Sequence, residues 1–493
     1  MKTALVLVPP NIPSMGSAAG GRYQATYNTE GDNASHYFPL WVCYAAGAVP
    51  TARAMDCNAE SISRESFLES VEDYDIYVFY ANQETIDYDT ETARLLHLDR
   101  PNCLVAFAGP YSTVAPEKVV ASPGIDMVIR GELENPLREL CAGKPFGEIK
   151  GLTFKNGAGV VSNPAGEPFE DLDSLPWVSQ IIQRDLSIHK YFIPFLNHPY
   201  ISIFSGRGCP YGCTYCLWPQ TIAGRRYRKR SISDVAEEML WIKREMPEIK
   251  EIQIEDDTFT CDRGRVLELC DALKGKDVSW SCCARYDLEE SVLSRMAEAG
   301  ARNLVVGFES GNDQILRNIK KGLSTEAAHG FRKACRKVGL KIHGCFILGL
   351  PGETHETMEQ TFKYACQLAP DTVQFAIATP YEGTAFNDYL REEGYLKRPR
   401  GITDSGHLSS RFDYPGLTGQ EIDEFAKKAW TKYYLRPSII ARHLIGAFSS
   451  FEDAKRFLSG AKYIGDYIFK NGPGKNGDKK ASAEQVLKES RQS

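Results

Sequence analysis

The feature that most restricts how this chain can fold is a repeated alternation of short apolar runs with helical stretches. In the first part of the chain, turn residues bound each of five short apolar runs: Thr3–Val8, Ala52–Cys57, Asp75–Ala81, Cys103–Gly109 and Ile125–Gly131. Such runs are typical of strands that are buried on both faces. Helical patterns between them, as in Pro39–Val49 and Thr90–Leu98, favour a parallel sheet covered by helices. We therefore expect an α/β chain with a doubly wound, Rossmann-like domain over residues 1–145.

The predicted strand ends of this domain indicate where a ligand binds. In a parallel sheet, ligands lie beyond the carboxyl ends of the strands, which here carry Pro10, Asn82, Gly109 and Gly131. Small residues at these ends let a large flat cofactor approach the backbone closely. The glycine-rich stretch 14–23 lacks the spacing of a phosphate loop, so we expect it to be a mobile loop that uses Arg22 as an anion contact.

A second series of strands is expected from Tyr200 onward. Its six runs are Tyr200–Ser205, Ile249–Ile254, Val278–Ala284, Asn303–Phe308, Lys341–Leu348 and Thr372–Ala378. Six strand and helix units predict a partial (β/α)6 barrel over residues 200–384, with reactive groups at the carboxyl ends of its strands. Asn156-Gly157 predicts a hairpin within a linker over residues 146–199. A mainly helical region is expected over residues 385–471, and a disordered tail over residues 472–493.

The first barrel strand leads into a loop with three closely spaced cysteines. Cys209, Cys213 and Cys216 are separated by three and then two residues, so their thiolates can converge on one metal centre. A set of three suggests an iron–sulfur cubane with one iron open to a ligand, because clusters that only carry electrons usually have a cysteine on every iron. A structural zinc site fits less well, because no further Cys or His follows before Cys261.

Composition narrows the class of protein. The 14 cysteines are scattered and often lie in apolar runs, as free cysteines do in a reducing compartment. A net charge of −6 gives no reason to expect nucleic acid as a partner. No signal-peptide pattern opens the chain, and no apolar run is long enough to span a bilayer. We therefore expect a cytoplasmic enzyme.

The cysteine loop, with Tyr215 directly before its last cysteine, resembles the cluster loop of the radical S-adenosylmethionine (radical SAM) enzymes. The resemblance implies a [4Fe–4S] cluster on Cys209, Cys213 and Cys216 whose open iron binds S-adenosylmethionine. It further implies that an electron from the cluster cleaves S-adenosylmethionine to methionine and a 5′-deoxyadenosyl radical. The electron would come from a donor such as flavodoxin or ferredoxin.

The same resemblance suggests further contacts to S-adenosylmethionine. Glu255 opens three consecutive acids where the family often has Gly-Gly-Glu, so the acid that holds the methionine amino group is open between Glu255, Asp256 and Asp257. Glu309 follows an apolar strand, where an acid is rarely needed for packing, and the family suggests a ribose or amino contact. Ile347 and Gly349 match the adenine-side segment. Arg285 fits either the S-adenosylmethionine carboxylate or an ordinary ion pair with Glu255 or Asp287.

A Rossmann-like domain before such a barrel resembles the cobalamin-binding subclass, which implies cobalamin as a cofactor. The chain lacks the Asp-x-His-x-x-Gly motif of some cobalamin proteins, and a domain kept only for packing and substrate shape is the alternative. Several local runs resemble the hopanoid-associated HpnJ-like subgroup, relatives of the anaerobic magnesium-protoporphyrin ester cyclase: Gly21–Gln24, Arg184–Leu186, His198–Tyr200, Cys216–Thr221 and Asp256–Thr260. That subgroup implies rearrangement of a hopanoid head group, the ring contraction that makes the cyclitol ether of bacteriohopanetetrol.

Two other functions remain open. One is a cobalamin-dependent radical SAM methyltransferase that methylates an unactivated carbon, and the other is a non-catalytic iron–sulfur protein for binding or electron transfer. A lipid-like substrate would use apolar residues near the site, such as Leu217-Trp218-Pro219. The stretch Ile439–Phe448 has the basic and apolar pattern of a helix on a membrane surface, although an ordinary domain helix fits it better.

Overall fold

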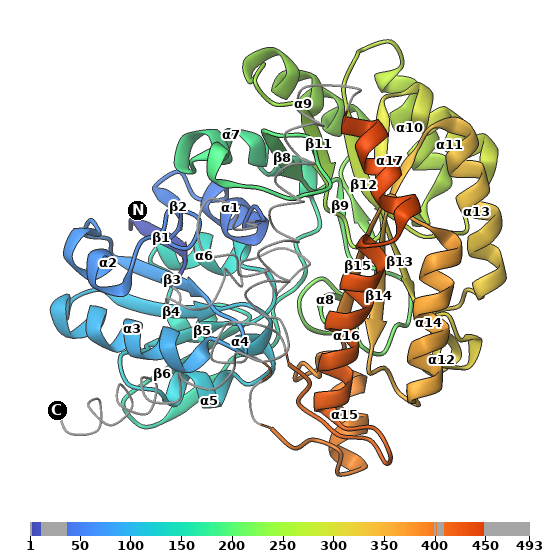
Figure 1. The fold of residues 1–493 in the computed structure, drawn as a ribbon. Helices are drawn as coiled ribbons and strands as arrows, with labels where there is room; N and C mark the ends of the chain where they lie inside the picture. Colours follow the sequence, from blue (N-terminus) through green and yellow to red (C-terminus); the bar gives the residue numbers. More distant parts are fainter. Residues whose placement is uncertain (1, 11–36, 399–400, 402–408, 448–493) are drawn as a thin grey trace.

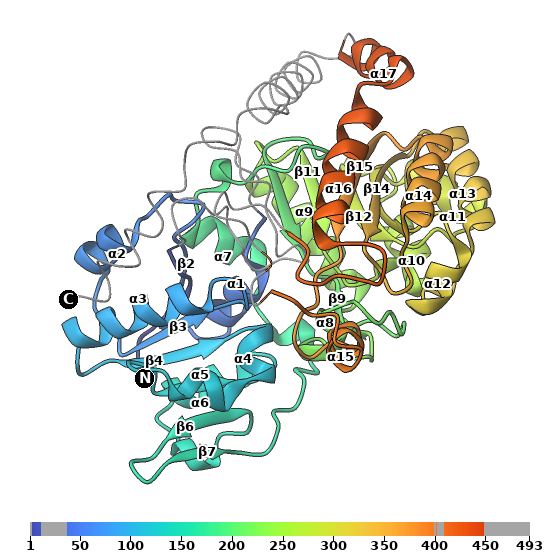
Figure 2. The same ribbon diagram turned by 60° about the horizontal axis from the view of Figure 1, so that its bottom comes forward.

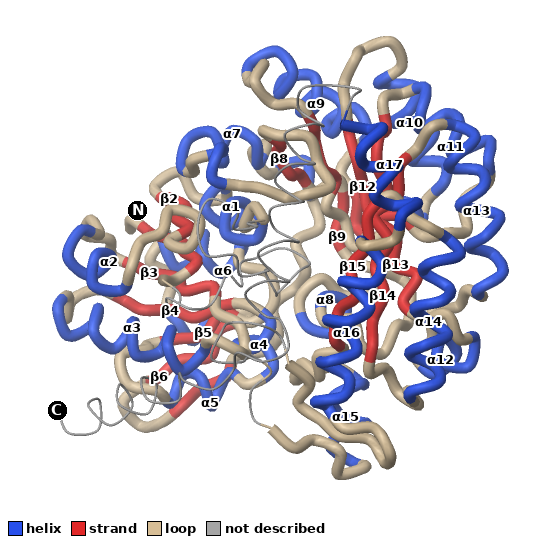
Figure 3. Tube along the Cα trace, viewed as in Figure 1, coloured by secondary structure: helices blue, strands red, loops and turns tan. Residues whose placement is uncertain are grey.

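The structure is a computed structural model that describes residues 2–10, 37–398, 401 and 409–447. The glycine-rich stretch with Arg22, the run Gly21–Gln24, Phe448 and the expected tail 472–493 lie outside the described residues. Figure 1 shows two groups of strands, one from the N-terminal part of the chain in blue and cyan and one from later residues in green to orange. Figure 3 shows that helices accompany both groups, so the chain is an α/β protein.

All five strands expected in the first domain are present, and they form the parallel part of one sheet. The sheet has seven strands in the order β2-β1-β3-β4-β5-β6-β7. Its strands are β1 (Ala4–Val8), β2 (Ala52–Asp56), β3 (Ile76–Tyr80), β4 (Leu104–Ala108), β5 (Met127–Ile129), β6 (Leu152–Lys155) and β7 (Val160–Ser162). The predicted hairpin at Asn156-Gly157 is β6–β7, which pairs antiparallel with β5 and so extends this sheet. The expected domain boundaries stay a prediction.

Alternate residues of β1 face opposite layers of helices, as expected for a doubly wound sheet. Ala4, Val6 and Val8 pack in a core with α1 and α6. Leu5 and Leu7 pack in a second core with α2, α3 and α5. These helices are α1 (Leu40–Gly47), α2 (Arg64–Ser70), α3 (Ile86–Asp99), α4 (Pro110–Val114), α5 (Pro116–Ala121) and α6 (Glu134–Cys141).

The six expected barrel strands form a second sheet in which each strand pairs in parallel with the next in the chain. Its order is β8-β11-β12-β13-β14-β15. The strands are β8 (Tyr200–Ile203), β11 (Glu251–Ile254), β12 (Trp280–Ala284), β13 (Ala301–Glu309), β14 (Lys341–Leu348) and β15 (Thr372–Ile377). Figure 2 shows α10, α11, α13 and α14 on one side of this sheet. The helices between β8 and β15 are α8 (Trp218–Thr221), α9 (Ile232–Glu245), α10 (Arg263–Leu273), α11 (Glu290–Glu298), α12 (Asp313–Asn318), α13 (Thr325–Val338) and α14 (His355–Leu368).

One apolar core continues from the first sheet into the second, through α1 and α7 (Val178–Asp185). Tyr44 of α1 stacks on Phe204 with ring centroids 5.5 Å apart, and Trp41 stacks on Trp218 at 6.1 Å. Buried ion pairs cross the same boundary. Arg207 Nη2 lies 2.7 Å from Glu134 Oε1, and both side chains are about 1% exposed.

Three helices follow the barrel: α15 (Ala385–Glu392), α16 (Gly419–Tyr434) and α17 (Pro437–Ala447). Tyr433 of α16 donates to the carbonyl oxygen of Pro370 at 2.7 Å, which fixes α16 beside β15. Exposed apolar side chains gather at the end of this region, at Leu435, Ile440 and Leu444. None of the described helices is long and apolar enough to cross a membrane.

Candidate active site

The cysteine loop begins where β8 ends, and acids after β11 hold its start. Asp256 accepts hydrogen bonds from the backbone N–H groups of Ser205 at 2.6 Å and Gly206 at 3.0 Å, and from the Tyr227 hydroxyl at 2.7 Å. Asp257 accepts from the N–H of Gly208, directly before Cys209, at 2.9 Å. Two of the three acids that the sequence left open therefore anchor the loop.

The rest of the loop is fixed by backbone contacts. Gly208 has a φ of +93°, and a Cβ there would lie 2.2 Å from the carbonyl oxygen of Arg226, so only glycine fits. The N–H of Thr214 donates to the carbonyl of Ile319 at 3.1 Å. The amide of Gln220 donates to the carbonyl of Cys216 at 2.6 Å. Two short strands that pair antiparallel, β9 (Gly206–Arg207) and β10 (Arg228–Lys229), join the two ends of the segment that carries the three cysteines.

The three cysteine side chains of this loop are half-buried, whereas most other cysteines are fully buried. Burial raises the pKa of the Cys213 thiol, while the nearby Lys321 ammonium lowers it. Among the residues that the structure describes, no group of three His, Cys, Asp or Glu side chains is arranged to hold a single metal ion. A cubane binds each cysteine on a different iron, so its ligands stand further apart than those of one ion. Three accessible thiols on one anchored loop fit such a cluster.

Glu309 lies at the carboxyl end of β13 in an unusual backbone conformation. Its φ is +64°, which is uncommon for a residue other than glycine and often marks a functional position. The β13–β14 register shifts between Gly307 and Glu309. The Glu309 side chain folds back over Gly307, where a Cβ would lie 2.1 Å from its Oε1.

The sequence prediction missed the partner of Glu309, which is Lys321. Lys321 Nζ donates to Glu309 Oε1 at 2.8 Å, and both side chains are buried. Burial alone would lower the pKa of Lys321, but Glu309 and Cys213 together outweigh it and raise that pKa. Burial also raises the pKa of Tyr215 well above its usual value, and the neighbouring Glu309 and Cys213 add to the shift. Glu309 and Lys321 therefore form a buried ion pair next to Tyr215 and Cys213 of the loop.

Arg285 and Glu255 lie at neighbouring strand ends. The Arg285 guanidinium lies 3.7 Å from the centre of the Tyr211 ring, and Arg285 Nε is 3.5 Å from Asp287 Oδ2. The alternative ion pair with Asp287 is therefore present. Glu255 is buried, and its N–H donates to the carbonyl of Ile203 at 2.9 Å.

The segment after β14 turns at Gly349, which has a φ of +85°. The carbonyl of Gly349 accepts from the Tyr414 hydroxyl at 3.0 Å, and its N–H donates to Glu353 Oε2 at 3.3 Å. Burial raises the pKa of Glu353 to about 7. Ile347 is half-buried on the preceding strand. After Lys321, Glu353 is the second residue with a shifted pKa that the sequence prediction did not identify.

The carboxyl edge of the first sheet holds the other predicted residues. Asn82 Oδ1 accepts from the N–H groups of Glu84 at 2.8 Å and Thr85 at 3.2 Å, at the start of α3. A Cβ on Gly109 would lie 2.4 Å from the carbonyl oxygen of Ala81, whereas the space around Gly131 is open. Pro10 is buried at the end of β1. The order β2-β1-β3 puts a topological switch point between β1 and β3, where open sheets of this kind bind ligands.

This edge contacts residues beyond the last barrel strand. Gln83 Oε1 accepts from the N–H of Glu382 at 2.9 Å. A Cβ on Gly383 would lie 2.5 Å from Val114 of α4 and 3.2 Å from Thr221 of α8. The two carboxyl edges therefore meet near the cysteine loop, and the predicted residues fall into two groups, one at each edge.

Residues 203–365 match the sequence profile of the Radical SAM superfamily. An uncharacterized methyltransferase of Pyrococcus horikoshii is 30% identical over 423 residues, which cover 82% of this chain and 90% of the relative. The chain belongs to the radical SAM superfamily. It is therefore an enzyme, and the superfamily implies a [4Fe–4S] cluster and S-adenosylmethionine, with an electron donor and a small-molecule substrate.

Two further similarities extend over most of this radical SAM chain. The anaerobic magnesium-protoporphyrin IX monomethyl ester cyclase of Cereibacter sphaeroides is 25% identical over 411 residues, which cover 79% of the chain and 64% of the cyclase. The structure of the radical S-adenosylmethionine methyltransferase TsrM from Kitasatospora setae, with cobalamin and a [4Fe–4S] cluster bound, aligns with a TM-score of 0.65. That alignment covers 89% of this chain and 90% of TsrM at 16% identity, so it shows a shared fold.

Proposed function

We propose that this enzyme is a cobalamin-dependent radical SAM methyltransferase that acts on a small molecule. The observation that carries the proposal is the meeting of two carboxyl edges, because a cofactor shared by a switch-point site and a barrel mouth needs both. The Pyrococcus relative named as a methyltransferase and the cobalamin-bound fold of TsrM support this choice. Both likenesses extend over the first sheet as well as the barrel, since each covers more than four fifths of the chain.

We assign the cluster to Cys209, Cys213 and Cys216 and the S-adenosylmethionine contacts to residues at the strand ends around them. When bound, the cluster supplies the electron that cleaves S-adenosylmethionine, and a corrin supplies a cobalt centre that can carry a methyl group. Glu309 would accept hydrogen bonds from S-adenosylmethionine, and Lys321 would hold the carboxylate in place at 2.8 Å. Glu255 remains the acid for the methionine amino group, because Asp256 and Asp257 hold the loop backbone.

The first sheet also offers features suited to a corrin. The space around Gly131 is open, so a flat ring can approach the backbone there, whereas the missing side chain of Gly109 makes room for the carbonyl of Ala81. Two buried polar atoms at the same edge, Ser112 Oγ and Gln83 Nε2, have no hydrogen-bond partner within the described protein. Such atoms usually find a partner in a ligand or water. No histidine lies among residues 81–84 or 109–112, so these two strand ends supply no axial imidazole.

The hopanoid head-group rearrangement rests on the sequence runs alone and stays a prediction. The cyclase relative shows that this sequence family extends beyond enzymes named as methyltransferases. Membrane contact and the identity of the electron donor likewise stay predictions.

The test is anaerobic reconstitution with iron, sulfide and hydroxocobalamin, followed by desalting and incubation with S-adenosylmethionine and a reductant. We expect one corrinoid to stay bound per chain, and both S-adenosylhomocysteine and 5′-deoxyadenosine to form when an acceptor is present. Formation of 5′-deoxyadenosine without S-adenosylhomocysteine would favour the rearrangement. Loss of the corrinoid on desalting with unchanged activity would mean that the first domain serves only packing and substrate shape.

A further inference from the structure

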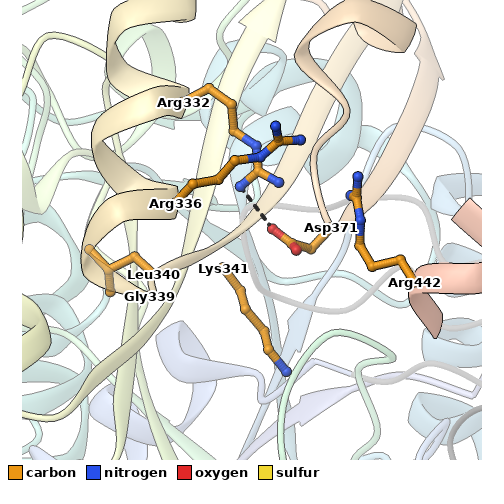
Figure 4. Close-up of a pocket in the computed structure, with 7 residues that line it drawn as sticks. All are labelled: Arg332, Arg336, Gly339, Leu340, Lys341, Asp371 and Arg442. Carbon is orange, nitrogen blue, oxygen red and sulfur yellow. Dashed lines mark hydrogen bonds and ion pairs between the residues drawn. The ribbon is translucent and has the colours of Figure 1, made fainter. Parts of the chain in front are cut away.

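A hollow lined mainly by basic residues lies at the opposite end of the barrel from the cysteine loop. It has a volume of about 400 Å³ and lies at the amino ends of β14 and β15. Arg332 and Arg336 reach it from α13, Arg442 reaches it from α17, and Lys341 and Asp371 line its remaining sides (Figure 4). Because the predicted cofactor residues lie at the carboxyl ends of the strands, this hollow is separate from the proposed active site.

The charges in the hollow do not balance. The described residues that line it include three arginines and one lysine but a single carboxylate, that of Asp371. Asp371 Oδ2 is itself already used, because it accepts from Arg332 Nη1 at 3.0 Å and from the N–H of Ile342 at 2.9 Å. A surplus of positive charge therefore remains.

Hydrogen-bond donors also outnumber acceptors. The three arginines share the carbonyl oxygen of Ala369, at 2.9 Å from Arg332, 3.4 Å from Arg336 and 3.0 Å from Arg442. Arg332 also donates to the carbonyl of Leu368 at 3.3 Å, and Arg442 to that of Pro370 at 3.1 Å. A carbonyl oxygen has two lone pairs, whereas each guanidinium has five N–H donors. Burial lowers the pKa of Arg332, Asp371 opposes this shift, and the charged neighbours Arg336 and Arg442 add to it.

Part of this arrangement has a structural role. Ala369 follows the last residue of α14, and cationic side chains at a helix C-terminus are favourable. One or two arginines would satisfy that helix end. The remaining donors call for a ligand with several acceptor oxygens.

We propose that this hollow binds a phosphate group. A phosphate matches the forked donors of arginine and offers several charged oxygens at once. The phosphate can belong to a soluble molecule or to the headgroup of an anionic lipid. The lipid source is worth testing because Ile440 and Leu444 on α17, the helix that supplies Arg442, are exposed.

The experiment uses the full-length, anaerobically reconstituted enzyme and compares phosphate with chloride at equal ionic strength. The test variant is Arg336→Gln with Lys341→Gln, because both side chains are exposed and Arg332 stays to hold α14. The control is Lys333→Gln with Lys363→Gln, which removes two exposed charges outside the hollow. Thermal unfolding reports binding of inorganic phosphate, and sedimentation with phosphatidylglycerol or phosphatidylcholine vesicles reports binding of lipid.

We expect phosphate to raise the melting temperature of the wild type and the control, with an affinity at least about tenfold weaker in the test variant. Binding of phosphatidylglycerol vesicles that the test variant loses would assign the phosphate to a lipid. Two results would overturn the proposal. One is a test variant that responds like the control, and the other is a wild type that binds neither phosphate nor anionic vesicles.

Discussion

At the residue scale, Glu309 and Lys321 allow binding to be separated from chemistry. Glu309→Gln keeps the shape of the side chain but removes the charge that pairs with Lys321 at 2.8 Å. Charge-assisted hydrogen bonds contribute roughly 1.5–3 kcal/mol each, so affinity for S-adenosylmethionine should fall about 10- to 100-fold. At saturating S-adenosylmethionine, formation of 5′-deoxyadenosine should largely recover.

Equilibrium binding and single-turnover product formation measure the two effects separately. Glu356→Gln, an exposed change on α14, is the control and should alter neither. A Glu309→Gln enzyme that binds S-adenosylmethionine normally but makes no 5′-deoxyadenosine would instead place Glu309 in the chemistry.

Cys213 should be indispensable, whereas the neighbouring Cys261 should not. Cys213→Ala removes one of the three proposed cluster ligands on the anchored loop, and we expect loss of the cluster absorbance and of all S-adenosylmethionine cleavage. Cys261 has similar partial exposure, and burial together with the nearby Cys209 raises its pKa, so Cys261→Ala is a matched control. Iron and sulfide analysis of both variants checks the assignment, which fails if Cys213→Ala retains four irons per chain.

Glu353 should make stability depend on pH. Burial raises its pKa to about 7 in the folded enzyme, from 4.5 in an exposed chain, so the folded state holds the proton more tightly. Its contribution to stability is complete below pH 4.5 and is lost as the pH rises through about 7. The loss amounts to roughly 3 kcal/mol at most. Glu353→Gln should flatten this part of the pH profile of urea unfolding, and an unchanged profile would contradict the shift.

The sequence singled out candidate site residues but could not assign all their roles. It placed three acids after the second barrel strand, yet the hydrogen bonds that commit Asp256 and Asp257 to the loop come from residues 49 to 51 positions away. Lys321 was missed because it lies in a polar loop with no periodic signal, and only folding brings it to Glu309. Pairings of this kind depend on tertiary structure.

At the element scale, Gly109 fixes how β4 ends beside β3. It has φ 107° and ψ 178°, a region open almost only to glycine, and a Cβ would overlap the carbonyl of Ala81. Gly109→Ala should therefore destabilise the fold by more than about 3 kcal/mol. Gly131→Ala is the control, because Gly131 has a positive φ in open space and should cost about 1–2 kcal/mol. Urea unfolding of both variants measures the difference, and equal losses would contradict the close contact.

Most strands could be predicted because each is a continuous apolar run bounded by turn residues. The same reasoning assigned residues 146–199 to a linker, although β6 and β7 from that segment lie in the first sheet. An antiparallel strand at a sheet edge can face solvent, so its sequence need not be a continuous apolar run, and Val160 of β7 is indeed exposed. The pair β9–β10 was not predicted, since strands of two residues show no periodicity.

At the scale of the whole molecule, buried ion pairs join the two sheets. Glu134→Gln removes the nearer anionic partner of the Arg207 guanidinium, in a site where both side chains are about 1% exposed, and leaves Glu132 at 3.6 Å. Breaking such a pair typically costs roughly 3–5 kcal/mol. The control lies on the same helix: Glu139 pairs with Lys144 at 2.7 Å in a position over one third exposed, where a pair contributes about 0–1 kcal/mol.

In thermal and urea unfolding, Glu134→Gln should therefore lose more free energy of unfolding than Glu139→Gln. Because Arg207 also lies 4.6 Å from the Trp41 ring, the Glu134→Gln enzyme should in addition show altered tryptophan fluorescence. Equal stability of the two variants would mean that the apolar core alone joins the sheets.

The order of the barrel strands has a consequence for biosynthesis. Each strand pairs with the one made just before it, so the sheet can grow at one edge while the chain leaves the ribosome. The cysteine loop is nevertheless made about fifty residues before Asp256 and Asp257, the acids that fix it. A nascent chain therefore presents its three thiols before their loop can be anchored, and iron–sulfur insertion belongs after β11 has been synthesised.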